Sequence, residues 1–334
     1  MYKSRRVLYG KLEQLRGLKL LVYATGDRPG METQIHSEVC DFFVNHLDAI
    51  GSTEKIGLYL YTMGGNTLAG WSIVNLIRQF CEDFEVIVPS KAHSTGTLMC
   101  LGASRIVMTK QATLGPIDPS VNTPLNPKIE GGAPDARMPV SVEAIKGYIE
   151  LAREEMGIAE EEGMSQVLLK LSDMVHPLVL GQVYRTRSQI QMLARSLIAN
   201  QIVDKVKSDE IISFLCSESG SHDYTINRRE ARDRLGLTLE TPDDELYQVI
   251  KEIYDDIHEE LELSNRFDPN TLLGPGTKHS YKVRRCLLES IAAGSHFYAS
   301  EGTLTRQNIQ TPQGITGTAI QDQRTFEGWR HYNG

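Results

Sequence analysis

Residues 58–67 read LYLYTMGGNT, and residues 86–97 read VIVPSKAHSTGT. Each stretch begins with an apolar run typical of a buried strand and continues through a turn of glycine or other small residues into a helical pattern. Strands that alternate with helices in this way indicate right-handed βαβ crossovers and a mostly parallel sheet. Both turns would then lie at the carboxyl edge of the sheet, where such folds bind their ligands.

The alternation continues on both sides of these turns. Apolar runs predict further strands at residues 18–24 and 105–108, and three- and four-residue apolar spacing predicts a helix within residues 36–50. The prolines and glycines of residues 116–139 predict a long irregular loop, and more helices are expected after Ser141. We therefore predict a catalytic domain over residues 1–240, an acidic helical extension over 241–305 and a loosely ordered or subunit-contacting tail over 306–334.

Composition excludes several classes of protein. The 334 residues are 40% hydrophobic, and 35 basic against 43 acidic side chains give a net charge of −8, which argues against nucleic acid as a partner. We see no apolar run long enough for a membrane segment and no secretory signal, so we expect a cytoplasmic protein. The five cysteines form no CxxC pair, and neither a metal site nor a cofactor is indicated.

Gly64 and Gly65 form the first of the two turns. Successive glycines after a buried strand allow backbone conformations closed to other residues and expose N–H groups that could hold an oxyanion or a phosphate. The alternative is a plain turn between strand and helix. The nucleotide motifs GxGxxG and GK[ST] are absent.

Ser94 stands in the second turn, where a strand gives way to a helix. It could be a nucleophile, or it could merely cap the helix, since serine is a preferred capping residue. If both turns lie at one sheet edge, the N–H groups of Gly65 and Thr95 could converge on one oxygen. This geometry suits acyl chemistry.

Three segments carry a family resemblance: LYLYTMGGNTLAG (58–70), VIVPSKAHSTGTLMCLGASRIVMTKQATLGPIDP (86–119) and HDYTINRREARDRLGL (222–237). With these segments the chain resembles the ClpP/crotonase superfamily over roughly residues 15–240. Within it, the serine dehydrogenase proteinase family is the most similar, followed by signal peptide peptidase A and the NfeD-type peptidases. The resemblance implies an α/β fold, a repeated ββα superhelix with a mostly parallel sheet, here followed by a helical C-terminal extension.

The resemblance also implies roles for individual residues. Ser94 would be the nucleophile, and the amides of Gly65 and Thr95 would form the oxyanion hole. Substrate would contact four residues near these turns, Gly64, Asn66, Gly115 and Pro116.

The general base stays open between several residues. Residues 105–137 lack the histidine that Clp-type relatives use, whereas peptidase A relatives use a lysine on a later helix, a position that Lys146 matches. A lysine acts as a base only when burial lowers its pKa. Lys128 is the next candidate, Lys110 and Lys170 follow, and His176 with Asp173 could form a displaced triad. We expect His93 to have a structural or pocket-lining role.

Together these features predict a cytoplasmic serine endopeptidase with a Ser–Lys dyad, a polypeptide substrate, no metal or cofactor, and a homo-oligomeric assembly. The loop over residues 116–139 could pair with substrate as an added strand or simply lie on the surface. Two alternatives are a non-catalytic oligomeric scaffold and a crotonase-type acyl-CoA hydrolase or hydratase. The second alternative would need carboxylate bases, and we find none at the two turns.

Overall fold

The computed structural model describes residues 1–117, 120–218, 221, 223–310 and 316–332. It divides into two compact units, one made of Met1–Leu114 with Ile226–Gly334 and the other of Gly115–Thr225. We call them the sheet unit and the helical unit. The boundaries that we predicted at residues 240 and 305 do not coincide with this division, because the helical unit is an insertion within the predicted catalytic domain.

The sheet unit is built on an eight-stranded sheet of order β10-β5-β3-β2-β1-β11-β12-β13. From β10 to β1 every neighbouring pair is parallel, which confirms the predicted mostly parallel sheet in an α/β fold. The strands are β1 (Lys19–Thr25), β2 (Thr53–Tyr61), β3 (Cys81–Val88), β5 (Arg105–Met108), β10 (Leu239–Glu240), β11 (Lys278–Ser290), β12 (Gly294–Gln310) and β13 (Thr316–Tyr332).

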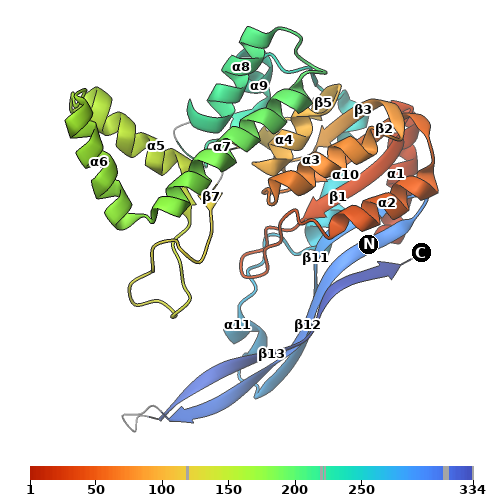
Figure 1. Cartoon of the computed structure of the whole chain (residues 1–334). Coiled ribbons are helices and arrows are strands. Elements are labelled where there is room, and N and C mark those ends of the chain that lie inside the picture. Colours follow the sequence, from red (N-terminus) through yellow and green to blue (C-terminus); the bar gives the residue numbers. More distant parts are fainter. Residues whose placement is uncertain (118–119, 219–220, 222, 311–315, 333–334) are drawn as a thin grey trace. The chain divides into compact units, whose positions relative to one another are not determined.

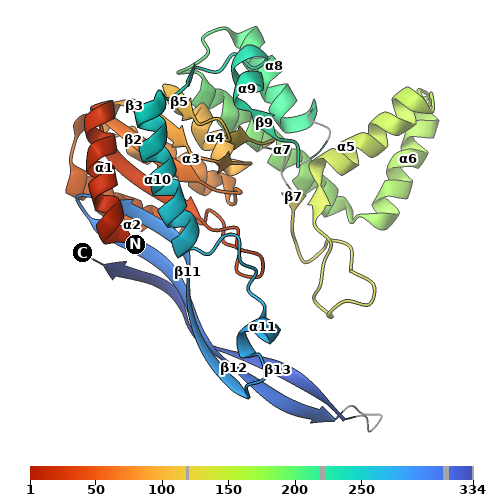
Figure 2. The same ribbon diagram turned by 180° about the vertical axis from the view of Figure 1, so that it is seen from behind.

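Helices cover both faces of this sheet. On the face seen in Figure 1 lie α2 (Val39–Ile50), α3 (Thr67–Ile77) and α4 (Thr95–Leu101). On the opposite face, α1 (Tyr2–Arg16) and α10 (Asp244–Glu260) pack side by side (Figure 2). The acidic helix that we predicted is α10, and its apolar stripe, including Ile250 and Ile253, is buried in the core beneath it. The sheet is therefore shielded from solvent on both sides, as parallel strands require.

The C-terminal part of the chain differs from the prediction. The extension is helical only in α10 and in α11 (Pro269–Leu273), and beyond them β11, β12 and β13 form an antiparallel ribbon that joins the main sheet through β1. The segment expected as a tail contains strand β13. Residues 311–315 and 333–334 of that segment lie outside the described residues.

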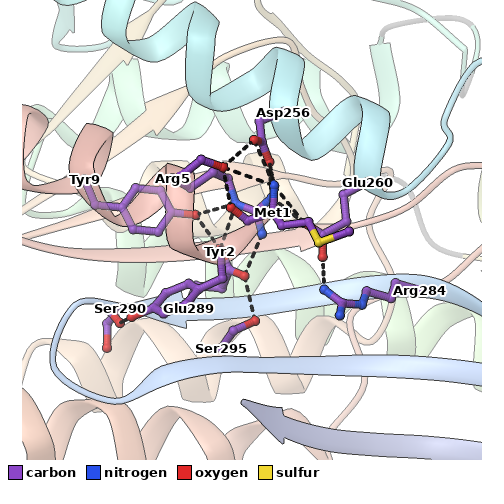
Figure 3. Close-up of polar contacts among 11 residues, drawn as sticks. Met1, Tyr2, Arg5, Tyr9, Asp256, Glu260, Arg284, Glu289, Ser290 and Ser295 are labelled. Carbon is purple, nitrogen blue, oxygen red and sulfur yellow. Dashed lines mark hydrogen bonds and ion pairs between the residues drawn. The ribbon is translucent and has the colours of Figure 1, made fainter. Parts of the chain in front are cut away.

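A buried polar network fixes α1 to β11 (Figure 3). Arg5 and Glu289 are both fully buried, and Arg5 Nη2 lies 2.7 Å from Glu289 Oε1. Tyr9 and Ser295 donate hydrogen bonds to the same carboxylate, and Arg5 also pairs with Glu260 of α10. Because every charge in the network has a partner, α1, α10 and β11 are locked in one register.

A second, three-stranded sheet supports the turn that contains Ser94. It consists of β4 (Lys91–Ala92), β6 (Thr113–Leu114) and β9 (Ile226–Asn227), in that order. The short helix α9 (Arg228–Asp233) follows β9 directly. The motif at residues 222–237 therefore returns the chain to the vicinity of the Ser94 turn after the insertion.

The helical unit contains α5 (Val142–Glu150), η1 (Leu151–Glu155), α6 (Glu161–Met174), α7 (Pro177–Ile198), α8 (Lys205–Ser213) and η2 (Phe214–Glu218). Its only strands among the described residues are β7 (Ser120–Val121) and β8 (Val140–Ser141), which pair and close the loop predicted over residues 116–139. Buried Asn126 holds this loop by donating to the carbonyls of Val121 and Met138. Asp118 and Pro119 lie outside the described residues.

In the part of the chain that the structure describes, no helix combines the length and the apolar composition needed to cross a membrane.

Candidate active site

The Gly64–Gly65 turn lies directly against Ser94. Gly64 has φ +112° and Gly65 has φ +142°, backbone conformations that residues with a Cβ rarely adopt. A Cβ placed on Gly64 would lie 2.7 Å from Ser94 Cβ and 3.1 Å from Ser94 Oγ. The first glycine is therefore required both by its φ and by the close approach of the serine.

A backbone bridge from the loop after β1 orients Gly65. Ile35 N donates to Gly64 O, and Asn66 N donates to Ile35 O, both at 2.8 Å. In a parallel bridge of this kind, the N–H and C=O of the central residue, Gly65, face away from the partner strand. Gly65 O accepts a 2.7 Å hydrogen bond from Thr95 Oγ1. The amide of Gly65 thus belongs to the face of the turn that meets the start of α4.

Ser94 itself is in an unusual backbone conformation. Its φ of 51° and ψ of −116° fall in a region that is costly for an L-residue, and among the described non-glycine residues Glu262 is the other one with positive φ. Ser94 occupies the N-cap position of α4, but its side chain makes no capping hydrogen bond. Its hydroxyl is therefore not used for capping, the role that was the alternative to a nucleophile.

Thr62 ties the two turns together at the end of β2. Thr62 N donates to Lys91 O and His93 N donates to Thr62 O, both at 3.0 Å. The Thr62 hydroxyl also accepts from Gly64 N at 2.9 Å. The imidazole of His93 contacts Thr113 Oγ1 at 2.9 Å, which agrees with the structural role expected for it.

The lysine closest to Ser94 in sequence, Lys91, is held in an ion pair. Its Nζ lies 2.7 Å from Asp27 Oδ2, and Tyr61 OH donates to Asp27 Oδ1 at 2.7 Å. Burial alone would raise the pKa of Asp27, but the hydrogen bonds from Lys91 and Tyr61 outweigh it and lower that pKa. This trio was not predicted from the sequence, because two helices and two strands separate Asp27 from Lys91 in the chain.

The predicted base, Lys146, lies on α5 in the helical unit, whereas Ser94 belongs to the sheet unit. The Lys146 side chain is 24% exposed, and its Nζ lies 3.2 Å from Glu150 Oε1. It lines a groove of about 360 Å³ between α5 and α7 together with Ile149 and Val183. The structure therefore brings Ser94, Gly64, Gly65, Asn66 and Thr95 together, and describes Lys146 in a separate compact unit.

The other candidates for the base also lie in the helical unit or are otherwise engaged. His176 Nδ1 accepts from Leu178 N at 3.2 Å and so caps α7, while Asp173 pairs with Lys170 at 3.6 Å. Lys128 forms a backbone bridge with Arg137, and the Lys110 ammonium sits over the ring of Tyr247.

Gly115 and Pro116, which we expected to contact substrate, begin the helical unit and are buried. No cluster of three or more histidine, cysteine or carboxylate groups suited to a metal ion occurs among the described residues.

Residues 44–130 match the family described as ClpP-like SDH-type serine proteinase. The matched segment is a part of the chain that includes both turns and Ser94, in agreement with the family resemblance inferred from these residues.

Two proteins of Methanocaldococcus jannaschii are similar to this chain. The uncharacterized protein MJ0137 is 27% identical over 201 residues, which cover 60% of this chain and 59% of that protein. The uncharacterized protein MJ1495 is 38% identical over 66 residues, or 20% of this chain and 23% of that protein. In both cases the match spans less than two thirds of the relative's own length.

Among solved structures, a serine-to-alanine mutant of the 1510-N membrane-bound stomatin-specific protease is 16% identical, covers 70% of this chain and 86% of that chain, and gives a TM-score of 0.39. A lysine-to-alanine mutant of the same protease in complex with a substrate peptide is 17% identical and covers 63% and 72%, with a TM-score of 0.37. A ClpP1 mutant from Listeria monocytogenes is 14% identical and covers 71% and 99%, with a TM-score of 0.38.

Proposed function

We propose that this protein is a serine endopeptidase that hydrolyses polypeptides through Ser94. The observation that carries the proposal is the placement of Ser94. Its backbone is strained, and its hydroxyl, which makes no capping hydrogen bond to α4, lies against the Gly64–Gly65 turn. The match of residues 44–130 to a serine proteinase family supports the same chemistry.

In the proposed reaction, Ser94 Oγ attacks the carbonyl carbon of a peptide bond while the base accepts its proton. The negative charge that develops on the carbonyl oxygen is stabilised by the N–H groups of Gly65 and Thr95, which lie on the two adjoining turns. The base then protonates the departing amine. Water next attacks the carbonyl of the acyl-enzyme and gives its proton to the base, which returns it to Ser94 Oγ as the carboxylic acid product leaves. Gly64, Asn66, Gly115 and Pro116 are proposed to contact the substrate backbone.

We propose Lys146 as the base. Its position on a later helix, which matches the lysine of peptidase A relatives, supports this assignment. Lys146 Nζ lies 3.2 Å from Glu150 Oε1, so the proposal requires this ion pair to be broken in the active enzyme. Lys128 and His176 are the alternative bases, and the hydrolysis assay described below also tests them.

The homo-oligomeric assembly and the cytoplasmic location expected from the sequence belong to the same proposal. For the assembly, support comes from the helical unit, where Leu169 is 66% exposed, Met174 70% and Leu178 68%. Large apolar side chains left exposed on a surface are those that an interface between proteins would cover.

The test combines covalent labelling with hydrolysis. Wild-type protein should react with a fluorophosphonate probe and cleave casein, Ser94→Ala should do neither, and Ser90→Ala, on the same turn, should retain both. Lys146→Met should lose hydrolysis by about a hundredfold or more, as expected for removal of a general base. Lys128→Met and His176→Gln should retain hydrolysis.

Three outcomes would contradict the proposal in different ways. Full hydrolysis by Ser94→Ala would reject the nucleophile, and full hydrolysis by Lys146→Met would reject the base alone. Turnover of acyl-CoA thioesters with no cleavage of casein or short peptides would reject the peptidase class in favour of crotonase-type chemistry.

A further inference from the structure

A cavity of about 430 Å³ lies beside the Gly64–Gly65 turn within the sheet unit. One wall is the segment from Glu32 to Val39, and the opposite wall comes from β11, β12 and β13. Ile35 and Asn66 line the cavity, and the same two residues form the backbone bridge that orients Gly65. The cavity and the candidate active site therefore share a wall.

The lining has an excess of negative charge. Glu32, Glu38 and Glu327 face a single arginine, Arg285, in the lining. Arg285 is already engaged, since it pairs with Glu327 and donates to the carbonyl of Met31 at 2.9 Å. Neither Glu32 nor Glu38 belongs to an ion pair within the described part of the chain, so two carboxylate charges remain uncompensated at the cavity.

Aromatic rings form the other side of the cavity. Tyr298 and Trp329 meet nearly edge to face, with ring centroids 5.8 Å apart and an angle of 76° between their planes. Trp329 also packs against Phe42, with ring centroids 4.9 Å apart, and its indole N–H donates to Glu38 Oε1 at 3.2 Å. An aromatic corner with a carboxylate at its edge attracts an organic cation through the ring quadrupole and through direct charge.

We propose that this cavity binds a cationic side chain, lysine or arginine, of the polypeptide substrate. Its role as a substrate subsite rests on the proposed peptidase function, but its affinity for a cation does not. An extended chain advances roughly 3.3 Å per residue, so a substrate held at the Gly64–Gly65 turn reaches the shared wall within a few residues of the cleaved bond. Glu38 would contact the cation, and Trp329 would provide the ring face.

Binding is tested first, without any need for hydrolysis. In a chain carrying Ser94→Ala and Trp71→Phe, Trp329 is the remaining tryptophan and reports on the cavity. Fluorescence is titrated with a hexapeptide containing one lysine and with the same peptide containing norleucine. We expect the lysine peptide to bind about 5- to 10-fold more tightly, and we expect added Glu38→Gln to remove most of that difference.

The matched control is Glu54→Gln, which neutralises an exposed glutamate on β2 away from the cavity. It should leave the lysine preference unchanged. Spermidine forms a separate arm: if it binds and the lysine peptide does not, the cavity is a small-cation site and the substrate subsite is rejected. Equal affinity for the lysine and norleucine peptides, with no response to spermidine, would overturn the inference altogether.

Hydrolysis of the same pair of peptides separates this inference from the proposed function. A preference in kcat/KM for the lysine peptide that Glu38→Gln abolishes supports the subsite. Active enzyme with no such preference rejects the subsite and leaves the peptidase function standing. Inactive enzyme that still binds the lysine peptide through Glu38 rejects the function and leaves the cation site standing.

Discussion

At the residue scale, the conformation of Ser94 can be tested through stability alone. Its φ of 51° favours glycine over any residue with a Cβ. We therefore expect Ser94→Gly to be more stable than Ser94→Ala by about 1 kcal/mol, although both lack the hydroxyl. Urea denaturation of the two variants measures this difference. Equal stabilities would show that the turn relaxes away from the described conformation.

Gly64 allows a second prediction at this scale. Gly64→Ala adds a methyl group 2.7 Å from Ser94 Cβ at a φ of +112°, so we expect destabilisation of about 2 kcal/mol or more and loss of hydrolysis. Gly51→Ala is the matched control, because Gly51 also has positive φ but has nothing within 4 Å of the added carbon. It should cost about 1 kcal/mol and leave hydrolysis intact. A similar loss of hydrolysis in both variants would argue against the contact with Ser94.

The sequence pointed to Ser94 and the two glycines as candidates, because a strand followed by a small-residue turn is a local pattern and the family resemblance implied roles for them. The sequence could not show that the Ser94 hydroxyl makes no capping hydrogen bond to α4, since that bond depends on one side-chain torsion. Nor could it reveal the Asp27–Lys91 pair, which forms only when β1 and the Ser94 turn come together.

At the scale of elements, the Arg5–Glu289 pair is expected to hold α1 on β11. Glu289→Gln removes the fully buried carboxylate from a guanidinium that also pairs with Glu260, which should lower the free energy of unfolding by about 3 kcal/mol. Lys11→Met, which removes the exposed pair between Lys11 of α1 and Glu245 of α10, should change the free energy of unfolding by less than about 1 kcal/mol. Urea titrations at neutral pH compare the two. A small effect of Glu289→Gln would mean that water or rearrangement compensates the charge.

Elements were predicted unevenly from the sequence. The parallel strands were recognisable because a strand buried on both faces is apolar throughout. Helix α1 was missed because its buried stripe consists of Tyr2, Arg5, Tyr9 and Leu12, where aromatic and charged side chains hide the helical spacing. Strand β13 was missed because it is the exposed edge of the sheet, where polar residues obscure the alternation.

At the scale of the whole molecule, three histidines connect α2 to the antiparallel ribbon. His46 Nε2 lies 2.8 Å from His296 Nδ1, and the rings of His296 and His331 stack at 4.1 Å. Burial, followed by the neighbouring imidazoles, lowers the pKa of His46 to about 3 and that of His296 to about 4. The folded state therefore holds the imidazoles of His46 and His296 neutral.

These lowered pKa values make the folded state less stable in acid. An unfolded histidine has a pKa of about 6.5, so below that pH the unfolded chain binds more protons than the folded chain. The free energy of unfolding therefore falls until the pH reaches the pKa of the folded histidine. His46 alone should lower the free energy of unfolding by about 2 kcal/mol at about pH 5, relative to neutral pH. Denaturant midpoints measured between about pH 7 and pH 5 should show this slope, His46→Gln should flatten it, and exposed His279→Gln should not. A slope unaffected by His46→Gln would contradict the assignment.

The exposed apolar surface of the helical unit leads to a prediction about assembly. Replacing Leu168 and Leu169 of α6 by glutamine should lower the molar mass found by light scattering, because both side chains are more than half exposed, at 55% and 66%. Val7→Gln, at a 75% exposed position on α1, is the control and should leave the mass unchanged. An unchanged mass in the double variant would place the subunit contact elsewhere.

Strand β1 pairs on one side with β2, which follows it closely in the chain, and on the other with β11, which lies more than two hundred residues later. During synthesis on the ribosome, at roughly 5–20 residues per second, one edge of β1 therefore waits on the order of ten seconds or more for its partner. A nascent chain in that interval exposes an apolar strand edge, the kind of surface that chaperones protect. Premature termination before Lys278 would make that exposure permanent, so truncated products of this chain should accumulate in aggregates.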